Sequence, residues 1–183
     1  MSQSARDELL EMLARHAFIE RKLTLASGKT SDYYLDCKRA LYLPKGAYLA
    51  GEVMLDLVLQ AKIEQLGGMA AGALPVTDAI VNAAYRRKTD LRGFFVRKET
   101  KAHGMQQRVE GAFQAGLRTA VIDDTVTTGG SSLDAVAAMR EAGANVIAAL
   151  ALVDRSEGGR EAFARAGLEY HHAFTADEIR RAR

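Results

Sequence analysis

The feature of this sequence that most constrains its fold is a repeated order of short apolar runs, each bounded by glycine or polar residues. The runs predict strands over 69–73, 93–97, 119–122 and 146–153, and the segments between them predict helices over 76–87, 132–142 and 158–166. Strands that alternate with helices are typical of a parallel sheet covered on both faces. The sequence therefore predicts an α/β fold, with a ligand site beyond the carboxyl ends of its strands.

The first 43 residues follow a different pattern. Residues 4–17 carry leucines and alanines at the spacing of an amphipathic helix, 24–31 are rich in turn residues, and 32–37 alternate as a strand does. Pro44 then opens a long helix that we expect to run to about Leu66 and to end at Gly67 and Gly68. We expect a single domain over 1–183, with a small N-terminal subdomain over 1–43 and a core over 44–183.

Composition excludes several classes of protein. Hydrophobic residues make up 48% of the chain and charged residues 26%, which is typical of a globular protein. The net charge of +2 is too small to indicate a nucleic-acid partner. Cys37 is the only cysteine, so no internal disulfide is possible, and His16, His171 and His172 lack partners at metal-binding spacing. Without a secretion signal or a long apolar run, we expect no membrane association and a cytoplasmic location.

Two carboxylates, Asp123 and Asp124, follow the apolar run 120–122, so we expect them to leave the sheet at its carboxyl edge. A loop of hydroxyls and glycines comes next, and it consists of Thr125, Val126, Thr127, Thr128, Gly129, Gly130 and Ser131. Such a loop before a helix binds phosphate, because backbone and hydroxyl donors converge and the helix dipole favours negative charge. Carboxylates bind sugar hydroxyls, directly or through a hydrated Mg²⁺ that also holds a diphosphate. In the simpler alternative, the aspartates solvate a strand end and Ser131 caps a helix.

A polar segment over 98–116 is long for a connection and indicates a functional loop. The stretch 95–104 leads into it with the cations Arg97, Lys98, Lys101 and His103, and three glycines stand at 104, 111 and 116. A mobile lid of this kind would neutralise the charge of a leaving diphosphate and exclude water. A solvated charged surface is the alternative.

Residues 121–131 resemble the signature of the type I phosphoribosyltransferases, which bind phosphoribosyl diphosphate (PRPP): apolar residues, two acidic residues and a Thr-Thr-Gly-x-Ser loop. Thr125 departs from it, since an aliphatic residue or serine is more usual there. The order aromatic-x-Arg-Lys-x-x-Lys-x-His-Gly over 95–104 resembles the lid of the orotate phosphoribosyltransferase family. Residues 23–36 resemble the Ser-Gly-Lys-x-Ser-x-Tyr element of that family, 72–75 its diphosphate loop, and 154–155 its late base-contacting arginine.

The resemblance implies a parallel-sheet type I phosphoribosyltransferase fold, in which the N-terminal subdomain is a hood over the base and 98–116 is a flexible lid. It implies transfer of the phosphoribosyl group of PRPP to orotate, giving orotidine 5'-monophosphate and diphosphate in de novo pyrimidine (UMP) synthesis. Lys101, Asp123 and Asp124 would be catalytic. Mg²⁺ would be held mainly through PRPP and water, with no assigned direct protein ligand.

The remaining roles that the resemblance implies concern binding. The acidic pair would hold the ribose hydroxyls, and the loop Thr125–Ser131 the 5-phosphate. The diphosphate would be bound by Arg97, Lys101 and His103, while Lys98 of a homodimer would reach into the neighbouring subunit's site. Orotate would be bound by Thr127, Arg155, Lys29 and Tyr34.

Two departures from the family pattern and two rival functions stay open. Ala26 and Val76 stand where some members carry lysine, and Lys29 would compensate for the first. One rival is a phosphoribosyltransferase for another base, such as a purine or uracil. The other is a PRPP-sensing regulator that binds the ligand without catalysis.

Overall fold

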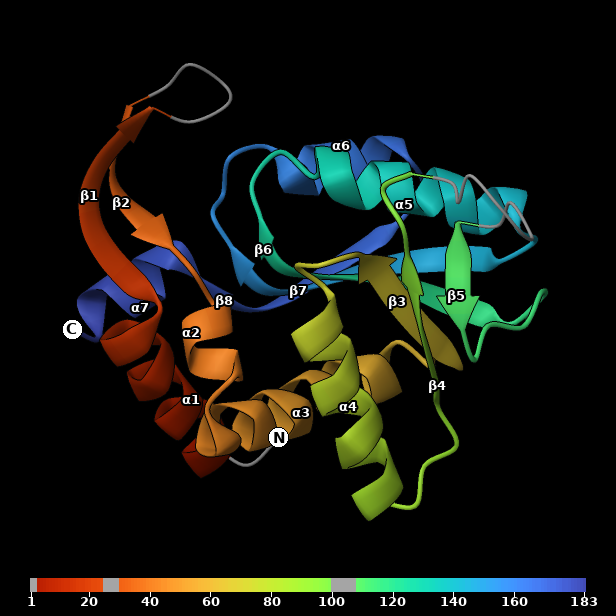
Figure 1. Ribbon diagram of the computed structural model, residues 1–183, viewed down its shortest axis with the longest axis horizontal. Coiled ribbons are helices and arrows are strands. Elements are labelled where there is room, and N and C mark those ends of the chain that lie inside the picture. The colour runs from red at the N-terminus through yellow and green to blue at the C-terminus, as the bar shows by residue number, and fades with distance from the viewer. Residues whose placement is uncertain (1–2, 25–29, 100–107) are drawn as a thin grey trace.

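The computed structural model describes residues 3–24, 30–99 and 108–183. Over these residues the main sheet has six strands in the order β5-β4-β3-β6-β7-β8 (Figure 1). Their bounds are β3 Gln65–Met69, β4 Arg92–Val96, β5 Val109–Gly111, β6 Arg118–Val126, β7 Asn145–Asp154 and β8 Glu169–Thr175. All neighbouring pairs are parallel except β4 with β5. The predicted α/β fold with a mostly parallel sheet is confirmed.

Helices cover both faces of this sheet, as Figure 1 shows. One face carries α1 (Gln3–His16), α2 (Lys38–Leu41), α3 (Pro44–Gln60), α4 (Leu74–Arg86) and α7 (Ala176–Arg181). The other face carries α5 (Gly130–Glu141) and α6 (Gly159–Arg165). Each set of helices buries its own hydrophobic cluster against the strands. No helix of the described residues is both long and apolar enough to cross a membrane.

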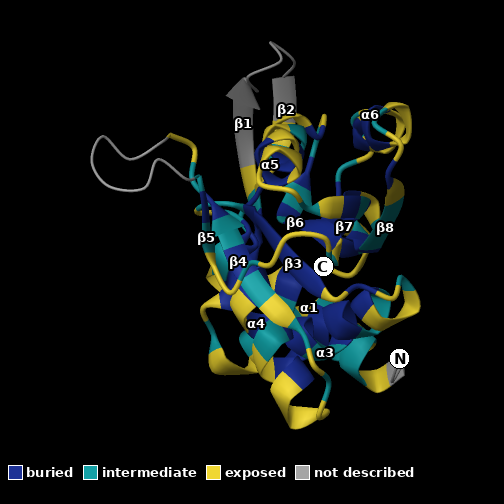
Figure 2. Ribbon diagram, turned by 90° about the vertical axis from the view of Figure 1, so that its right-hand side faces the viewer, coloured by how far each residue is buried: buried dark blue, intermediate teal, exposed yellow. Residues whose placement is uncertain are grey.

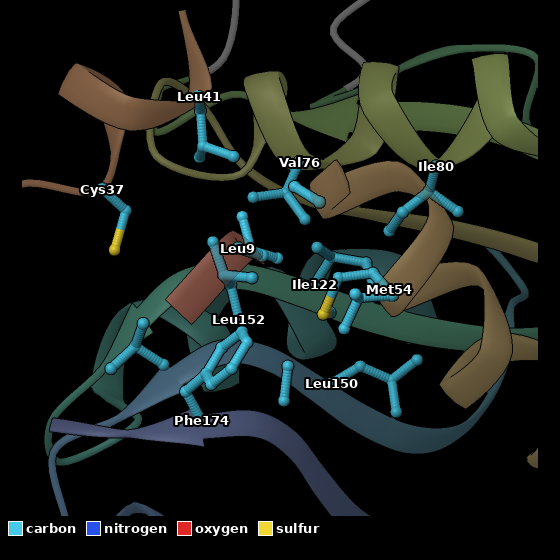
Figure 3. Close-up of a cluster of buried hydrophobic side chains, with 14 of the residues drawn as sticks. Leu9, Cys37, Leu41, Met54, Val76, Ile80, Ile122, Leu150, Leu152 and Phe174 are labelled. Carbon is cyan, nitrogen blue, oxygen red and sulfur yellow. The ribbon is translucent and has the colours of Figure 1, made fainter. Parts of the chain in front are cut away.

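The central strands are buried on both sides because their apolar residues alternate between the two clusters. Ile122 of β6 and Leu150 of β7 face the larger cluster, whereas Val121 and Ala149 face the smaller one. Figure 3 shows Ile122 and Leu150 in the larger cluster, among side chains from the surrounding helices. The same strands form the dark interior of Figure 2. A continuous apolar run is therefore the correct signal for these parallel strands.

The N-terminal subdomain contains a separate hairpin, which we call the hood. Its strands β1 (Phe18–Thr24) and β2 (Thr30–Leu35) pair with each other and not with the main sheet. The rings of Phe18 and Tyr33 stack at 4.9 Å between centroids. The sequence predicts no strand over 18–24, because the charged run 20–22 hides the alternation of β1.

The expected end of the long helix at Gly67 and Gly68 is also wrong. Helix α3 ends at Gln60, and both glycines lie inside β3. A Cβ on Gly67 would lie 2.4 Å from the backbone oxygen of Phe94, and one on Gly68 would lie 1.9 Å from that of Ile122. The glycines are there because neighbouring backbone approaches β3 too closely for a side chain.

The segment 98–116, expected to be an irregular lid, is partly strand. Val109–Gly111 pairs antiparallel with β4, and Phe113 packs edge-on against Phe94 at 5.2 Å between centroids. The side chain of Gln65 accepts a hydrogen bond from the Gln114 N–H at 3.0 Å. The carboxyl-terminal part of the predicted lid therefore belongs to the sheet, while residues 100–107 lie outside the described ranges.

Candidate functional site

The strand order places a topological switch point between β3 and β6. The chain leaves β3 through α4 on one face, and it leaves β6 through α5 on the other face. Ligands of open α/β sheets bind at such a point, beyond the carboxyl ends of the two strands. The first turns of α4 and α5 follow these ends directly, and their unpaired N–H groups favour anions.

Asp123 and Asp124 lie near the carboxyl end of β6, but the strand does not stop before them. Residues 123, 125 and 126 still pair with β7, so the expected strand end at Ile122 is four residues too early. The apolar run stops at Ile122, but backbone pairing continues because the parallel ladder does not depend on side-chain polarity. The carboxylates are thus fixed by the sheet rather than carried by a loop.

Local contacts position both carboxylates. The Ser132 hydroxyl donates to Asp123 Oδ2 at 2.7 Å, and the Asp124 N–H donates to Asp123 Oδ1 at 3.0 Å. The pKa of Asp123 is raised to about 6, mainly by burial; the Ser132 hydrogen bond opposes the rise and the neighbouring Asp124 carboxylate contributes to it. Burial also raises the pKa of Asp124, against the opposing effect of Lys38. A raised pKa on two adjacent carboxyls is a common property of functional sites.

The loop after β6 is shorter than the sequence predicts. Thr125 and Val126 belong to β6, and α5 begins at Gly130, so the connecting loop is 127–129. Gly129 has φ +80°, a left-handed conformation that favours glycine, and a Cβ there would meet the Phe163 ring at 3.1 Å. Thr128 and Ser131 are exposed at the start of α5. This arrangement of hydroxyls and helix N–H groups fits a phosphate.

Gly72 brings the loop after β3 against the acidic pair. A Cβ on Gly72 would lie 3.1 Å from Asp124 Oδ1 and 3.4 Å from Asp123 Oδ1. The next residues, Ala73 and Leu74, open α4. The loops that precede α4 and α5 therefore flank the same two carboxylates, and a ligand with an anionic group at each end and hydroxyls between them matches this order.

Arg155 connects the main sheet to the hood. Its guanidinium lies over the Tyr33 ring at 4.8 Å from the centroid, and its Nε lies 2.9 Å from Glu157 Oε1. The backbone N–H of Arg155 donates to the Val126 backbone oxygen at 2.9 Å, next to the loop 127–129. The side chain is only 5% exposed. Tyr34, on the same strand as Tyr33, is 41% exposed.

The other residues predicted for the site divide into two groups. Arg97 pairs with Glu110 of the adjacent β5 at 3.3 Å, and Lys98 is exposed. Lys29, Lys101 and His103 lie outside the described residues. The structure brings together Asp123, Asp124 and the loop 127–129, and it places Arg155 beside that loop.

Lys38 is a residue that the sequence analysis missed. Its ammonium lies 3.5 Å from Asp124 Oδ2 and 3.0 Å from Asp36 Oδ1. The neighbouring Cys37 Sγ lies 3.3 Å from the Thr125 hydroxyl, and burial raises the pKa of this thiol to about 12. Lys38 is 86 residues from Asp124 in the sequence. A lysine two residues after the Tyr-Leu-Asp sequence at the end of β2 was the available signal.

The described residues contain no group of three or more histidine, cysteine or carboxylate side chains that could hold a metal ion.

No protein-family model matches the chain, but curated proteins and solved structures do. It is 47% identical over 167 residues to the orotate phosphoribosyltransferase of Rhodopirellula baltica, which covers 88% of this chain and 86% of that protein. It is 44% identical over 175 residues to that of Streptomyces coelicolor, covering 95% and 96%. The Mycobacterium tuberculosis orotate phosphoribosyltransferase complexed with PRPP has a TM-score of 0.81 and 32% identity, covering 96% of this chain and 98% of that one.

Proposed function

The chain belongs to the orotate phosphoribosyltransferase family, and we propose that it carries out the reaction of this family at the Asp123–Asp124 site. It transfers the phosphoribosyl group of PRPP to orotate, giving orotidine 5'-monophosphate and diphosphate in pyrimidine synthesis. The observation that supports this location is the convergence of the loop after β3 and the loop after β6 on two adjacent carboxylates.

PRPP matches this convergence group by group. The 5-phosphate is bound by the loop 127–129 and the first turn of α5, with hydroxyls from Thr127, Thr128 and Ser131. The ribose hydroxyls donate to Asp123 and Asp124. The diphosphate lies toward Gly72 and the first turn of α4, where the cations Arg97, Lys101 and His103 of the predicted lid would contact it.

Orotate is bound between the core and the hood. Arg155 follows β7 with its backbone bonded beside the loop 127–129, and its planar guanidinium lies over Tyr33 of the hood; such a group suits a carboxylate or ring carbonyls. Thr127, in that loop, is the proposed hydroxyl contact. Tyr34 and Lys29 are the proposed contacts from the hood, and Lys29 stands in for the lysine that some relatives carry at position 26.

The reaction breaks the bond between carbon 1 of the ribose and the diphosphate oxygen, and the electron pair leaves with the diphosphate. A ring nitrogen of orotate supplies the electron pair of the new bond to carbon 1, and the proton of that nitrogen passes to the released diphosphate or to water. Positive charge develops on the ribose in the transition state, and the carboxylates of Asp123 and Asp124 stabilise it. Lys101 acts on the leaving diphosphate. Positioning and charge supply the rate enhancement, so no side-chain nucleophile is needed.

Three further properties are proposed with this function. Mg²⁺ would be held mainly through PRPP and water, with no assigned direct protein ligand, and would supply charge neutralisation at the diphosphate. The active unit is a homodimer in which Lys98, exposed at the end of β4, reaches the neighbouring subunit's site. A cytoplasmic location stays a prediction from the sequence.

The test is the loss of orotate absorbance on addition of PRPP and Mg²⁺, with uracil, adenine and hypoxanthine as parallel acceptors. Wild-type protein consumes orotate, and Asp124→Asn lowers turnover by about 10²-fold or more, because a charge-stabilising group of the transition state is lost. Asp90→Asn, an exposed aspartate outside the site, is the matched control and retains activity. Consumption of another base in place of orotate would overturn the acceptor. If none of the four bases causes release of diphosphate from PRPP, the proposed chemistry is overturned.

A further inference from the structure

The segment 36–38 joins the hood to α2, and it lies against β6 at the acidic pair. Lys38 Nζ contacts Asp124 Oδ2 at 3.5 Å, and Asp36 Oδ1 holds the same ammonium at 3.0 Å. Beside it, Cys37 Sγ contacts the Thr125 hydroxyl at 3.3 Å. Two consecutive residues of the segment therefore contact two consecutive residues of β6, so the contact has a defined register.

Asp124 needs such a contact because of its surroundings. The residue is 7% exposed, and its carboxylate adjoins that of Asp123. Burial raises the pKa of both carboxyls, and the Asp124 carboxylate raises that of Asp123 as well. Within the described part of the chain, Lys38 is the cation that pairs with Asp124. Asp123 is held differently, by the Ser132 hydroxyl and a backbone N–H.

We propose that Lys38 is a positioning residue of the PRPP site: held by Asp36, its ammonium orients the Asp124 carboxylate and keeps it ionised to accept the ribose hydroxyls. This inference rests on the proposed function of the acidic pair. Lys38 acts through Asp124 and is not assigned a contact with either substrate. Its side chain is 39% exposed.

The arrangement makes a specific prediction about pH. The groups that face Asp124 are Asp123 on its own strand, and Lys38, Asp36 and the Cys37 thiol on the segment from the hood. Of these only Lys38 is positive, and an opposite charge at this distance lowers the pKa of an aspartate by about 1–3 units. Removing it raises the pKa of Asp124, so a larger fraction of the carboxyl is protonated at mildly acidic pH. Asp123 and Asp124 titrate together, so the change in pKa is measured as a shift of the acidic side (acid limb) of the pH–activity profile.

The variants are Lys38→Met, which keeps the length of the side chain without charge, and Lys38→Arg, which keeps the charge. Lys45→Met is the matched control, since Lys45 forms a surface ion pair with Glu8 at 2.7 Å outside the site. We expect Lys38→Met to raise the KM for PRPP about three- to tenfold at pH 6, with a smaller change in the KM for orotate. Its acid limb moves up by about one pH unit, the lower end of the range because the pair is partly exposed.

Recovery in Lys38→Arg and no shift in Lys45→Met complete the expected result. An unchanged acid limb and PRPP KM in Lys38→Met would overturn the proposal, as would equal effects in Lys45→Met. If Lys38→Met loses its cooperative thermal transition, Asp36→Asn replaces it. That variant loosens the ammonium without altering Asp124, and it gives a smaller shift in the same direction; no shift overturns the proposal. Wild-type turnover of orotate, measured first, separates a failure of this inference from a failure of the proposed function.

Discussion

Asp123→Asn should make the ligand-free protein more stable while abolishing its activity. The carboxyl is partly buried beside Asp124, and its pKa rises from an ordinary 3.8 to about 6. A shift of about two units corresponds to about 3 kcal/mol of unfavourable ionisation at neutral pH. This is an upper limit, since water reaches part of the side chain. The amide removes this cost.

Weakened hydrogen bonds in Asp123→Asn reduce this gain in stability. Asp123 accepts from the Ser132 hydroxyl at 2.7 Å and from the Asp124 N–H at 3.0 Å. An asparagine can accept from the N–H and donate to the serine, but it exchanges charged bonds for neutral ones at a cost of about 1 kcal/mol. The net expectation is a gain of about 1–2 kcal/mol above pH 7, or roughly 2–8 °C in Tm for a chain of this size.

The pH dependence gives the sign. The folded protein binds this proton more tightly than the unfolded chain does, so the cost is absent below about pH 4 and complete above about pH 6. Urea unfolding of both proteins between pH 4.5 and 8.5, without ligand, measures the difference in the free energy of unfolding. The advantage of Asp123→Asn should grow through this window and then level off. A constant difference, or an advantage for the wild type that grows with pH, would refute the reasoning.

Two substitutions test the ligand contacts. Gly72→Ala places a methyl group 3.1 Å from Asp124 Oδ1, so the KM for PRPP should rise about tenfold (about 1.4 kcal/mol) while the melting temperature changes little. An unchanged KM for PRPP in steady-state kinetics would show that this loop does not bind the donor. Arg155→Lys keeps the charge but loses the planar group over Tyr33, so the KM for orotate should rise by about tenfold or more, with the KM for PRPP near the wild-type value. A raised KM for PRPP with an unchanged KM for orotate would contradict the assignment of Arg155 to the acceptor.

The sequence predicted the parallel core well because its signals are local. An apolar run such as 119–122 or 146–153 needs burial on both faces, and a strand of a covered sheet provides it. The same reasoning failed at Gly67 and Gly68. A pair of glycines ends a helix or permits close backbone approach, and only the position of Phe94 and Ile122 across the sheet decides between these roles.

The candidate site divides in the same way. The acidic pair and the following loop are contiguous, so their chemistry could be read directly from 123–131. Lys38 could not be found in this way, because its relation to Asp124 depends on how the hood returns to the core 86 residues earlier in the chain. Predicted contacts of Lys29, Lys101 and His103 stay predictions, since these residues lie outside the described ranges.

The pairing of β3 with β6 has a consequence for how this enzyme could change its acceptor. Parallel neighbours are held about 4.8 Å apart by backbone hydrogen bonds, whatever side chains they carry. The distance between the loops after these two strands is therefore fixed by the sheet, and it sets the length of the sugar phosphate donor that can bind. The hood is a separate hairpin, so its sequence can change without altering the distance between those loops. Exchanging residues 18–35 together with Arg155 should therefore change the acceptor preference without altering recognition of the donor.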